Sequence, residues 1–267
     1  MIVSNKASLL WRQLPADLHT RMEDILRRHP GATVFFRADD VAIPSIKQDR
    51  LLGIFARHDA PLCAALVPAW MTVKHWEAIA RSVQGKHHLF AWHQHGWNHL
   101  NHESAGKKQE FGPGANPEQK RRAIIRGRDK LVSILGNHFL PVFTPPWNRL
   151  DPETIGILLD AGFRAISRYR GDKLPSLPGL PDLPVNVDLH TRKETSPEAG
   201  WDAFLAELDQ ALASGRVGFM LHHQRMNEAA FDFLDALLPM LRAHTDISLV
   251  HFGEILGNTP VTTLSTP

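Results

Sequence analysis

Histidines are concentrated in one short segment of the chain, at a density that folding alone does not require. The segment from Trp92 to His99 reads WHQHGWNH, and His102 follows closely. His95 and His99 are four residues apart, so a helical turn after His95 would place both imidazoles on one face. Two such nitrogens could bind one divalent metal ion. A catalytic zinc ion usually has three protein ligands and one open position, so the sequence predicts a third ligand from elsewhere in the chain.

Two adjacent acids supply the best candidate for that third ligand. Asp39 and Asp40 end the apolar segment 33–38, and a carboxylate completes the ligand set beside two histidines in some catalytic zinc sites. Two other interpretations stay open. His93 and His95 have the two-residue spacing used by amidohydrolase-type barrels, which would place both imidazoles on one strand face. Two histidines and one carboxylate could also bind iron, by ligand type alone.

The remaining sequence alternates between short apolar segments and amphipathic ones, which predicts alternating strands and helices. We expect strands over 33–38, 62–67, 89–93, 139–144, 163–167, 185–189, 217–221 and 247–252, and helices over 47–57, 73–83, 117–135, from 151–153 onward, 201–213 and 228–243. This alternation requires a parallel sheet or a barrel. The unusual polar residues follow the expected strands, where either architecture gathers its functional residues: Asp39-Asp40, 93–99, Trp147-Asn148, Asp188 and His222.

Composition and charge are those of an ordinary globular protein. The chain has 267 residues, 43% of them hydrophobic, and a formal net charge of +2, so we expect one domain with a large core. Residues 1–30 are expected to form an amphipathic helical extension. The basic run from Lys120 to Arg122 is expected on a solvated helix face, and no nucleic-acid partner is expected. Cys63 is the only cysteine, so no internal disulfide can form. Neither a signal peptide nor a membrane span is expected, which predicts a cytoplasmic protein.

Two loops also attract attention. The segment from Glu103 to Asn116 is too long and polar to be a simple connector, and it could cover a site as a lid. Lys107 and Lys108 in this loop could contact an anionic part of a ligand, although an ordinary solvated loop explains them equally well. The segment 171–184 is rich in proline and glycine and is expected to be a loop.

Four motifs in order along the chain resemble those of polysaccharide deacetylases of the NodB-homology type (carbohydrate esterase family 4). They are Arg37-Ala38-Asp39-Asp40, His95-Gly96-Trp97-Asn98-His99, Thr144-Pro145-Pro146-Trp147 and Leu221-His222, and the closing segment 249–254 is also similar to the end of that domain. The resemblance covers about residues 33–256. It implies a distorted (β/α) barrel of about seven parallel strands, with the site at the carboxyl ends of the strands.

The resemblance also implies an activity, which is the removal of an N-acyl group from a sugar or glycan with a divalent metal, usually zinc. Asp40, His95 and His99 would bind the metal. Asp39 would be the general base and His222 the general acid, and Asp188 would orient His222. Candidate substrate-binding residues are Trp97, Trp147, Asn148 and Arg149, although each tryptophan could equally belong to the core.

The chain departs from the family pattern at several positions, which indicates a divergent member. Thr144 stands where the family has the arginine that positions the base, and Arg37, Arg149 or Arg168 could replace it in space. His223 adjoins His222, and strand alternation allows only one of them to point inward. A catalytically degenerate, glycan-binding member is therefore one alternative, and an amidohydrolase acting on a small non-sugar amide is another. The substrate expected for a cytoplasmic enzyme is an intermediate of surface-polysaccharide synthesis.

Overall fold

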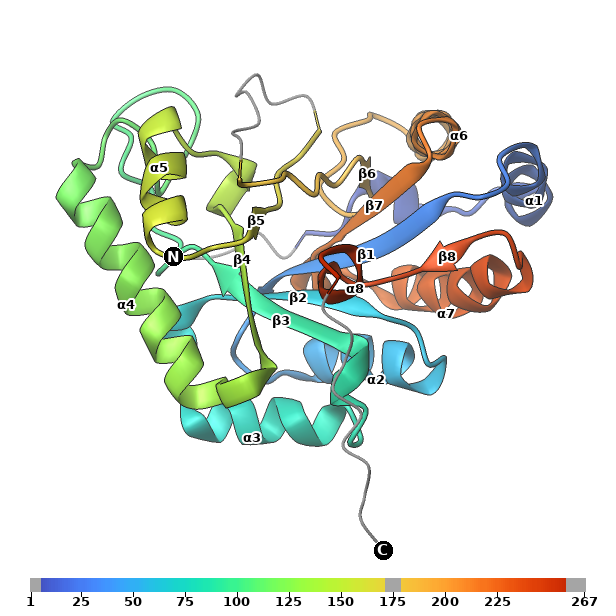
Figure 1. The fold of residues 1–267 in the computed structure, drawn as a ribbon. Helices are drawn as coiled ribbons and strands as arrows, with labels where there is room; N and C mark the ends of the chain where they lie inside the picture. Colours follow the sequence, from blue (N-terminus) through green and yellow to red (C-terminus); the bar gives the residue numbers. More distant parts are fainter. Residues whose placement is uncertain (1–5, 171–178, 258–267) are drawn as a thin grey trace, which may run out of the picture.

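A parallel β-sheet lies at the centre of the computed structural model, which describes residues 6–170 and 179–257 (Figure 1). Its strands are β1 (Thr33–Val41), β2 (Leu62–Leu66), β3 (Phe90–His95), β4 (Phe139–Thr144), β5 (Ala165–Ile166), β6 (Val187–Asp188), β7 (Arg216–Leu221) and β8 (Ser248–Leu249). Seven strands follow the order β5-β4-β3-β2-β1-β7-β6, and β8 pairs with β1. Every pair is parallel, so the distorted barrel of about seven parallel strands is confirmed.

The segment 180–188 connects the two edges of this curled sheet. Leu183 donates its backbone N–H to the Ile166 carbonyl at 2.8 Å, and Val185 donates to the Arg168 carbonyl at 2.9 Å. On the other side, Asn186 donates to the Gly218 carbonyl at 2.9 Å, next to the pairing of β6 with β7. The segment expected to be a loop over 171–184 therefore includes barrel-closing residues at its end. Residues 171–178 of that expectation lie outside the described part of the chain.

Helices cover the outside of the barrel (Figure 1), except the short α8, which packs against its inner core. They are α1 (Leu18–Arg28), α2 (Ile46–Arg57), α3 (Val73–Ser82), α4 (Pro117–Leu135), α5 (Pro152–Asp160), α6 (Pro197–Ala213), α7 (Glu228–Ala243) and the short α8 (Phe252–Ile255). Proline at the first position and a capping side chain begin several of them; Ser196, for example, accepts a hydrogen bond from Ala199 N. This start signal places the beginning of α6 four residues before the expected Trp201.

Side-chain alternation along β1 divides its residues between two cores. Val34, Phe36 and Ala38 point outward into the main core beneath the helices. Phe35 points inward, where it meets Phe252 of α8 at 5.2 Å between ring centroids. Because successive side chains point to opposite faces, Arg37 and Asp39 follow Phe35 on the inner face. The apolar floor of the barrel thus lies directly beneath its polar residues.

The helical extension predicted over residues 1–30 contains α1, which buries Leu18, Met22, Ile25 and Leu26. Residues 1–5 of the extension lie outside the described part of the chain. Lys120, which was predicted on a solvated helix face, is instead buried, and its ammonium pairs with Asp151 and with Glu153.

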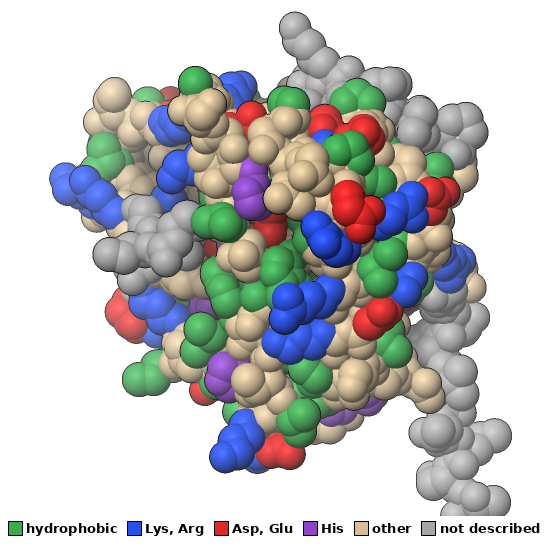
Figure 2. All heavy atoms as spheres, turned by 90° about the vertical axis from the view of Figure 1, so that its left-hand side faces the viewer, with side chains coloured by type: hydrophobic (Ala, Val, Ile, Leu, Met, Phe, Trp, Pro, Cys, Tyr) green, Lys and Arg blue, Asp and Glu red, His purple; other side chains and the backbone are tan. Residues whose placement is uncertain are grey.

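Charged side chains of both signs are scattered among apolar ones on the face seen in Figure 2. Among the described helices, none combines the length and the apolar character needed to cross a bilayer.

Candidate metal centre and active site

Asp40, His95 and His99 meet at the carboxyl ends of β1 and β3, and all three are buried. The Nε2 atoms of His95 and His99 each lie 3.3 Å from Asp40 Oδ1, and the candidate ligand atoms all lie within 4.8 Å of one another. Asp40 Oδ1 has no hydrogen-bond partner among the described residues. A buried carboxylate oxygen facing two imidazole nitrogens fits a divalent cation, which would satisfy all three groups.

Neighbouring groups prepare the two histidines differently. His95 Nδ1 lies 3.0 Å from the Thr144 carbonyl oxygen, which fixes the tautomer and leaves Nε2 for a ligand. Burial alone would lower the pKa of His95, but Asp40 and Asp39 outweigh it and raise that pKa. Burial, aided by the charge of His95, lowers the pKa of His99 to about 4. His99 is therefore neutral at pH 7, the form that binds a metal.

The path from His95 to His99 is a loop and not the helical turn that the four-residue spacing suggested. Gly96 and His99 both have left-handed backbone conformations, with φ of 55° and 58°. A Cβ atom at Gly96 would lie 2.4 Å from Glu110 Oε2 and 2.5 Å from Pro146 Cγ, so only glycine fits there. Both imidazoles nevertheless face Asp40 Oδ1.

The buried carboxylate of Glu110 supports the loop 96–99 by accepting its backbone N–H groups. Its Oε1 accepts backbone N–H groups from Trp97 at 3.2 Å and Asn98 at 2.9 Å, and its Oε2 accepts that of His99 at 3.1 Å. Burial raises the pKa of Glu110 to about 7, although the three N–H groups favour its charged form. The loop 103–116 thus places a buried carboxylate against the backbone of residues 97–99. Sequence reasoning missed Glu110, because no local motif distinguishes it from other acids in that loop.

Asp39 lies beside the triad and is held by Arg37. The guanidinium Nε and Nη2 donate to the two oxygens of Asp39 at 2.8 Å each, and both side chains are buried. Arg37 also donates to the carbonyl and hydroxyl oxygens of Ser167 at 2.9 Å and to Asn148 Oδ1 at 2.6 Å. Burial alone would raise the pKa of Asp39, but Arg37, followed by His95 and His222, outweighs it and lowers that pKa. Among the three arginines considered, Arg37 therefore makes the contact that Thr144 cannot.

His222 follows β7 and is the nearer of two adjacent histidines to Asp39. Its Nε2 lies 3.9 Å from Asp39 Oδ2, and its side chain is partly exposed. His223 is buried, and burial lowers its pKa to about 4. Asp188 accepts backbone N–H groups from His190 at 2.8 Å and Thr191 at 2.9 Å. Among the described residues, no hydrogen bond joins Asp188 to His222. The prediction that Asp188 orients His222 is therefore not supported by a contact.

Comparisons with known proteins agree with this arrangement at the level of the fold. A protein assigned as a polysaccharide deacetylase from Mycobacterium smegmatis superposes with a TM-score of 0.63 at 20% identity, covering 86% of this chain and 90% of that one. One from Pseudomonas aeruginosa PAO1 gives a TM-score of 0.60 at 13% identity, covering 94% and 96%. The chain has the polysaccharide-deacetylase fold. No protein-family model and no curated protein matches the sequence.

The fold neighbours include a pseudoenzyme. A family 4 carbohydrate esterase pseudoenzyme from Bacillus anthracis superposes with a TM-score of 0.52 at 14% identity, covering 86% of this chain and 67% of that one. The polysaccharide-deacetylase fold therefore agrees with the family resemblance of the four motifs, and it leaves the activity to be argued from the site.

Within this fold, the two tryptophans predicted to bind substrate have different surroundings. The ring of Trp147 meets that of His99 edge-on, with 4.3 Å between the centroids, and the Trp70 ring lies 6.1 Å from that of His99. Trp97 instead lies beneath Arg126, whose guanidinium carbon is 4.6 Å from its ring centroid, and it packs against a core cluster. Sequence reasoning missed Trp70, which comes from a 3₁₀ turn after β2.

Three further candidate residues lie in other contacts. Asn148 bonds Arg37, as described above. Arg149 donates to the Lys108 carbonyl at 3.4 Å on the exposed loop. His93 places Nε2 2.9 Å from the Thr144 hydroxyl and Nδ1 3.1 Å from the Ala91 carbonyl. His93 is thus outside the triad, and the amidohydrolase interpretation of its spacing with His95 loses its geometric basis.

Proposed function

We propose that this protein is a metal-dependent hydrolase that removes an N-acyl group, most simply N-acetyl, from a sugar or glycan. The observation that carries the proposal is the pair of adjacent aspartates at the end of β1, which are held in different environments. Asp40 faces two imidazoles, while Asp39 is fixed by a bidentate guanidinium. The Asp40 carboxylate is thus available to bind a metal, and the Asp39 carboxylate to accept a proton.

Asp40, His95 and His99 would hold the ion. When bound, it would supply Lewis acidity to the acyl carbonyl and to the attacking water. Zinc suits one carboxylate and two imidazoles, as do other first-row ions. The ligand set therefore supports a divalent metal and leaves its element to be measured.

The remaining steps belong to Asp39 and His222. Asp39 is ionised because Arg37 lowers its pKa, and it would accept the proton of the attacking water. His222, 3.9 Å away from it, would donate a proton to the departing sugar nitrogen. Arg37 keeps the carboxylate in one orientation, which is the role that the family gives to an arginine at the position of Thr144. Trp147 and Trp70 beside His99 offer apolar faces for the sugar ring.

A glycan-binding protein without activity is the second candidate, and the pseudoenzyme among the fold neighbours favours it. The two candidates differ in one measurable property. In a hydrolase, the site hydrolyses an N-acyl bond and depends on Asp39, whereas a binding protein needs only to bind the sugar.

The test is a screen of N-acetylated and N-formylated sugars and small amides for released acid, with wild type, Asp39→Asn and His99→Ala in parallel. We expect Asp39→Asn to keep the metal and lose about 10²–10⁴-fold in turnover, and His99→Ala to lose metal and turnover together. Equal turnover in wild type and Asp39→Asn would overturn the mechanism. Binding of sugars without turnover of any substrate would favour the glycan-binding candidate.

A further inference from the structure

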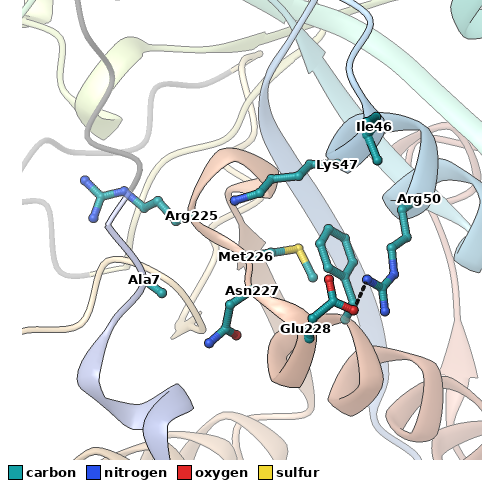
Figure 3. Close-up of a pocket in the computed structure, with 9 residues that line it drawn as sticks. Ala7, Ile46, Lys47, Arg50, Arg225, Met226, Asn227 and Glu228 are labelled. Atoms are coloured by element: carbon teal, nitrogen blue, oxygen red, sulfur yellow. Dashed lines mark hydrogen bonds and ion pairs between the residues drawn. The ribbon is translucent and has the colours of Figure 1, made fainter.

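A cavity opens at the amino ends of α2 and α7 (Figure 3). Its volume is about 280 Å³, near the lower end for ligand pockets. It is lined by Ala7, Ile46, Lys47, Arg50, Arg225, Met226, Asn227, Glu228 and Phe231. Three of these side chains are cationic and one is anionic, so the lining carries net positive charge.

The cations differ in their partners. Arg50 pairs with Glu228 at 2.6 Å and with Asp232 at 3.2 Å, and its guanidinium stacks over Phe231 at 4.5 Å. Lys47 donates only to a neutral group, the Gln224 carbonyl, at 3.0 Å. Among the ion pairs of the described residues, none includes Lys47 or Arg225. Two positive charges at this cavity are thus not neutralised by a carboxylate.

Backbone dipoles add to the positive character. The lining includes the first residues of α2, Ile46 and Lys47, and both the capping Asn227 and the first residue of α7. The positive ends of two helices therefore meet at one cavity, although Glu228 partly offsets that of α7. An arginine, a lysine and two helix amino ends together are suited to a phosphate group, which accepts several charge-assisted hydrogen bonds.

The cavity is connected to the proposed site through one residue. The Gln224 side-chain amide donates to the Asp40 carbonyl at 3.2 Å, while the Gln224 carbonyl accepts from Lys47. Arg225 follows His222 by three residues, so the two Cα atoms are at most about 11 Å apart. A ligand with its acyl group at the metal triad could therefore reach the cavity with its next substituent.

We infer that this cavity binds a phosphate attached to the N-acyl sugar, so that the substrate is a phosphorylated or diphosphate-linked sugar. The inference rests on the proposed function for the identity of the sugar, but not for the binding of phosphate. In this inference, Lys47 and Arg225 contact the anionic part of the substrate. Lys107 and Lys108 of the exposed loop 103–116 do not.

The test measures binding directly, by calorimetry, so that it does not depend on turnover. The probes are inorganic phosphate, N-acetylglucosamine, N-acetylglucosamine 1-phosphate, UDP-N-acetylglucosamine and a prenyl-diphosphate-linked N-acetylglucosamine. The proteins are wild type, the double variant Lys47→Gln/Arg225→Gln and the matched control Lys107→Gln/Lys108→Gln. We expect the phosphorylated sugars to bind at least about tenfold tighter than the neutral sugar, and the first double variant to lose that advantage. The control double variant should keep it.

The possible results separate the two proposals. Phosphorylated sugars that bind no tighter than the neutral sugar, or that bind equally to wild type and Lys47→Gln/Arg225→Gln, would overturn the inference. Loss of the advantage only in the Lys107→Gln/Lys108→Gln control would also overturn it. Tight binding through the cavity without hydrolysis would leave the phosphate site standing and remove the proposed hydrolase. Among the three phosphorylated sugars, the tightest identifies whether the carrier is a single phosphate, a nucleotide or a prenyl chain.

Discussion

Replacement of Arg37 by methionine should destabilise the protein strongly, because it would leave Asp39 buried without a counter-charge. The Arg37 side chain has no exposed surface and that of Asp39 is 3% exposed. Removing one partner of such a buried pair typically costs about 3–5 kcal/mol. Because domains are stable by only about 5–15 kcal/mol, Arg37→Met should lower the free energy of unfolding by roughly a third. The expected fall in Tm is about 10 °C.

A double-mutant cycle assigns this loss to the pair. Asp39→Asn removes the stranded charge, so Arg37→Met/Asp39→Asn should lose less than the sum of the single variants, by about 2 kcal/mol or more. Arg37→Lys is the matched control; it keeps the charge without the planar fork, and an intermediate loss is expected. Urea unfolding followed by circular dichroism, with a chelator present to exclude metal binding, measures all four variants. A loss below about 1 kcal/mol in Arg37→Met, or additive effects, would refute the reasoning.

Two other predictions concern Glu110 and Asp235. Glu110→Gln should weaken metal binding by about 10–100-fold in a competition with a chelator, because an amide nitrogen would face one of the three N–H groups that Glu110 accepts. Glu103→Gln in the same loop is the control. Equal metal affinities in the two variants would contradict the supporting role of Glu110. Burial alone would raise the pKa of Asp235, but Arg57 and His58, at 2.6 and 2.7 Å, outweigh it and lower that pKa. The folded pKa thus lies below the unfolded one, so this stabilisation is present at neutral pH and is lost as the pH falls below about 4. Asp235→Asn should cost no more than about 1 kcal/mol at pH 7 and less at pH 3. Urea midpoints at the two pH values measure this cost, and an equal cost at both would contradict the prediction.

Much of the candidate site could be predicted from the sequence because its residues lie where strands end. Asp40 and His95 lie at the carboxyl ends of β1 and β3, two strands of one parallel sheet, and the residue types alone indicate a metal. The route to His99 could not be predicted, since it depends on the left-handed backbone at Gly96 and on support from a distant loop. The same holds for Arg37. Its position two residues before Asp39 is compatible with contact, but only its place inside the barrel shows that its guanidinium holds both oxygens of Asp39.

Strand bounds could be predicted where strands are long and apolar, and less well where strands pair over only a few residues. β1 and β7 were expected within a few residues of their observed bounds. β5, β6 and β8 each contain two residues, because each pairs with a neighbouring strand over only two positions. No sequence pattern encodes such short pairings. His251 begins α8 as a capping residue, which shortens the strand expected over 247–252.

The central position of β1 has a consequence for how this protein is made. This strand pairs with residues 216–221 of β7 and 248–249 of β8, which leave the ribosome long after it. At about 5–20 residues per second, roughly 10–40 s of translation separate the strand from its partner β7. During that interval the apolar edge Val34-Phe35-Phe36 has no native partner on that side, which exposes it to pairing with other nascent chains. Synthesis should therefore depend on chaperones that bind the emerging chain, and folding should be slow because its decisive contacts are the most distant ones in sequence.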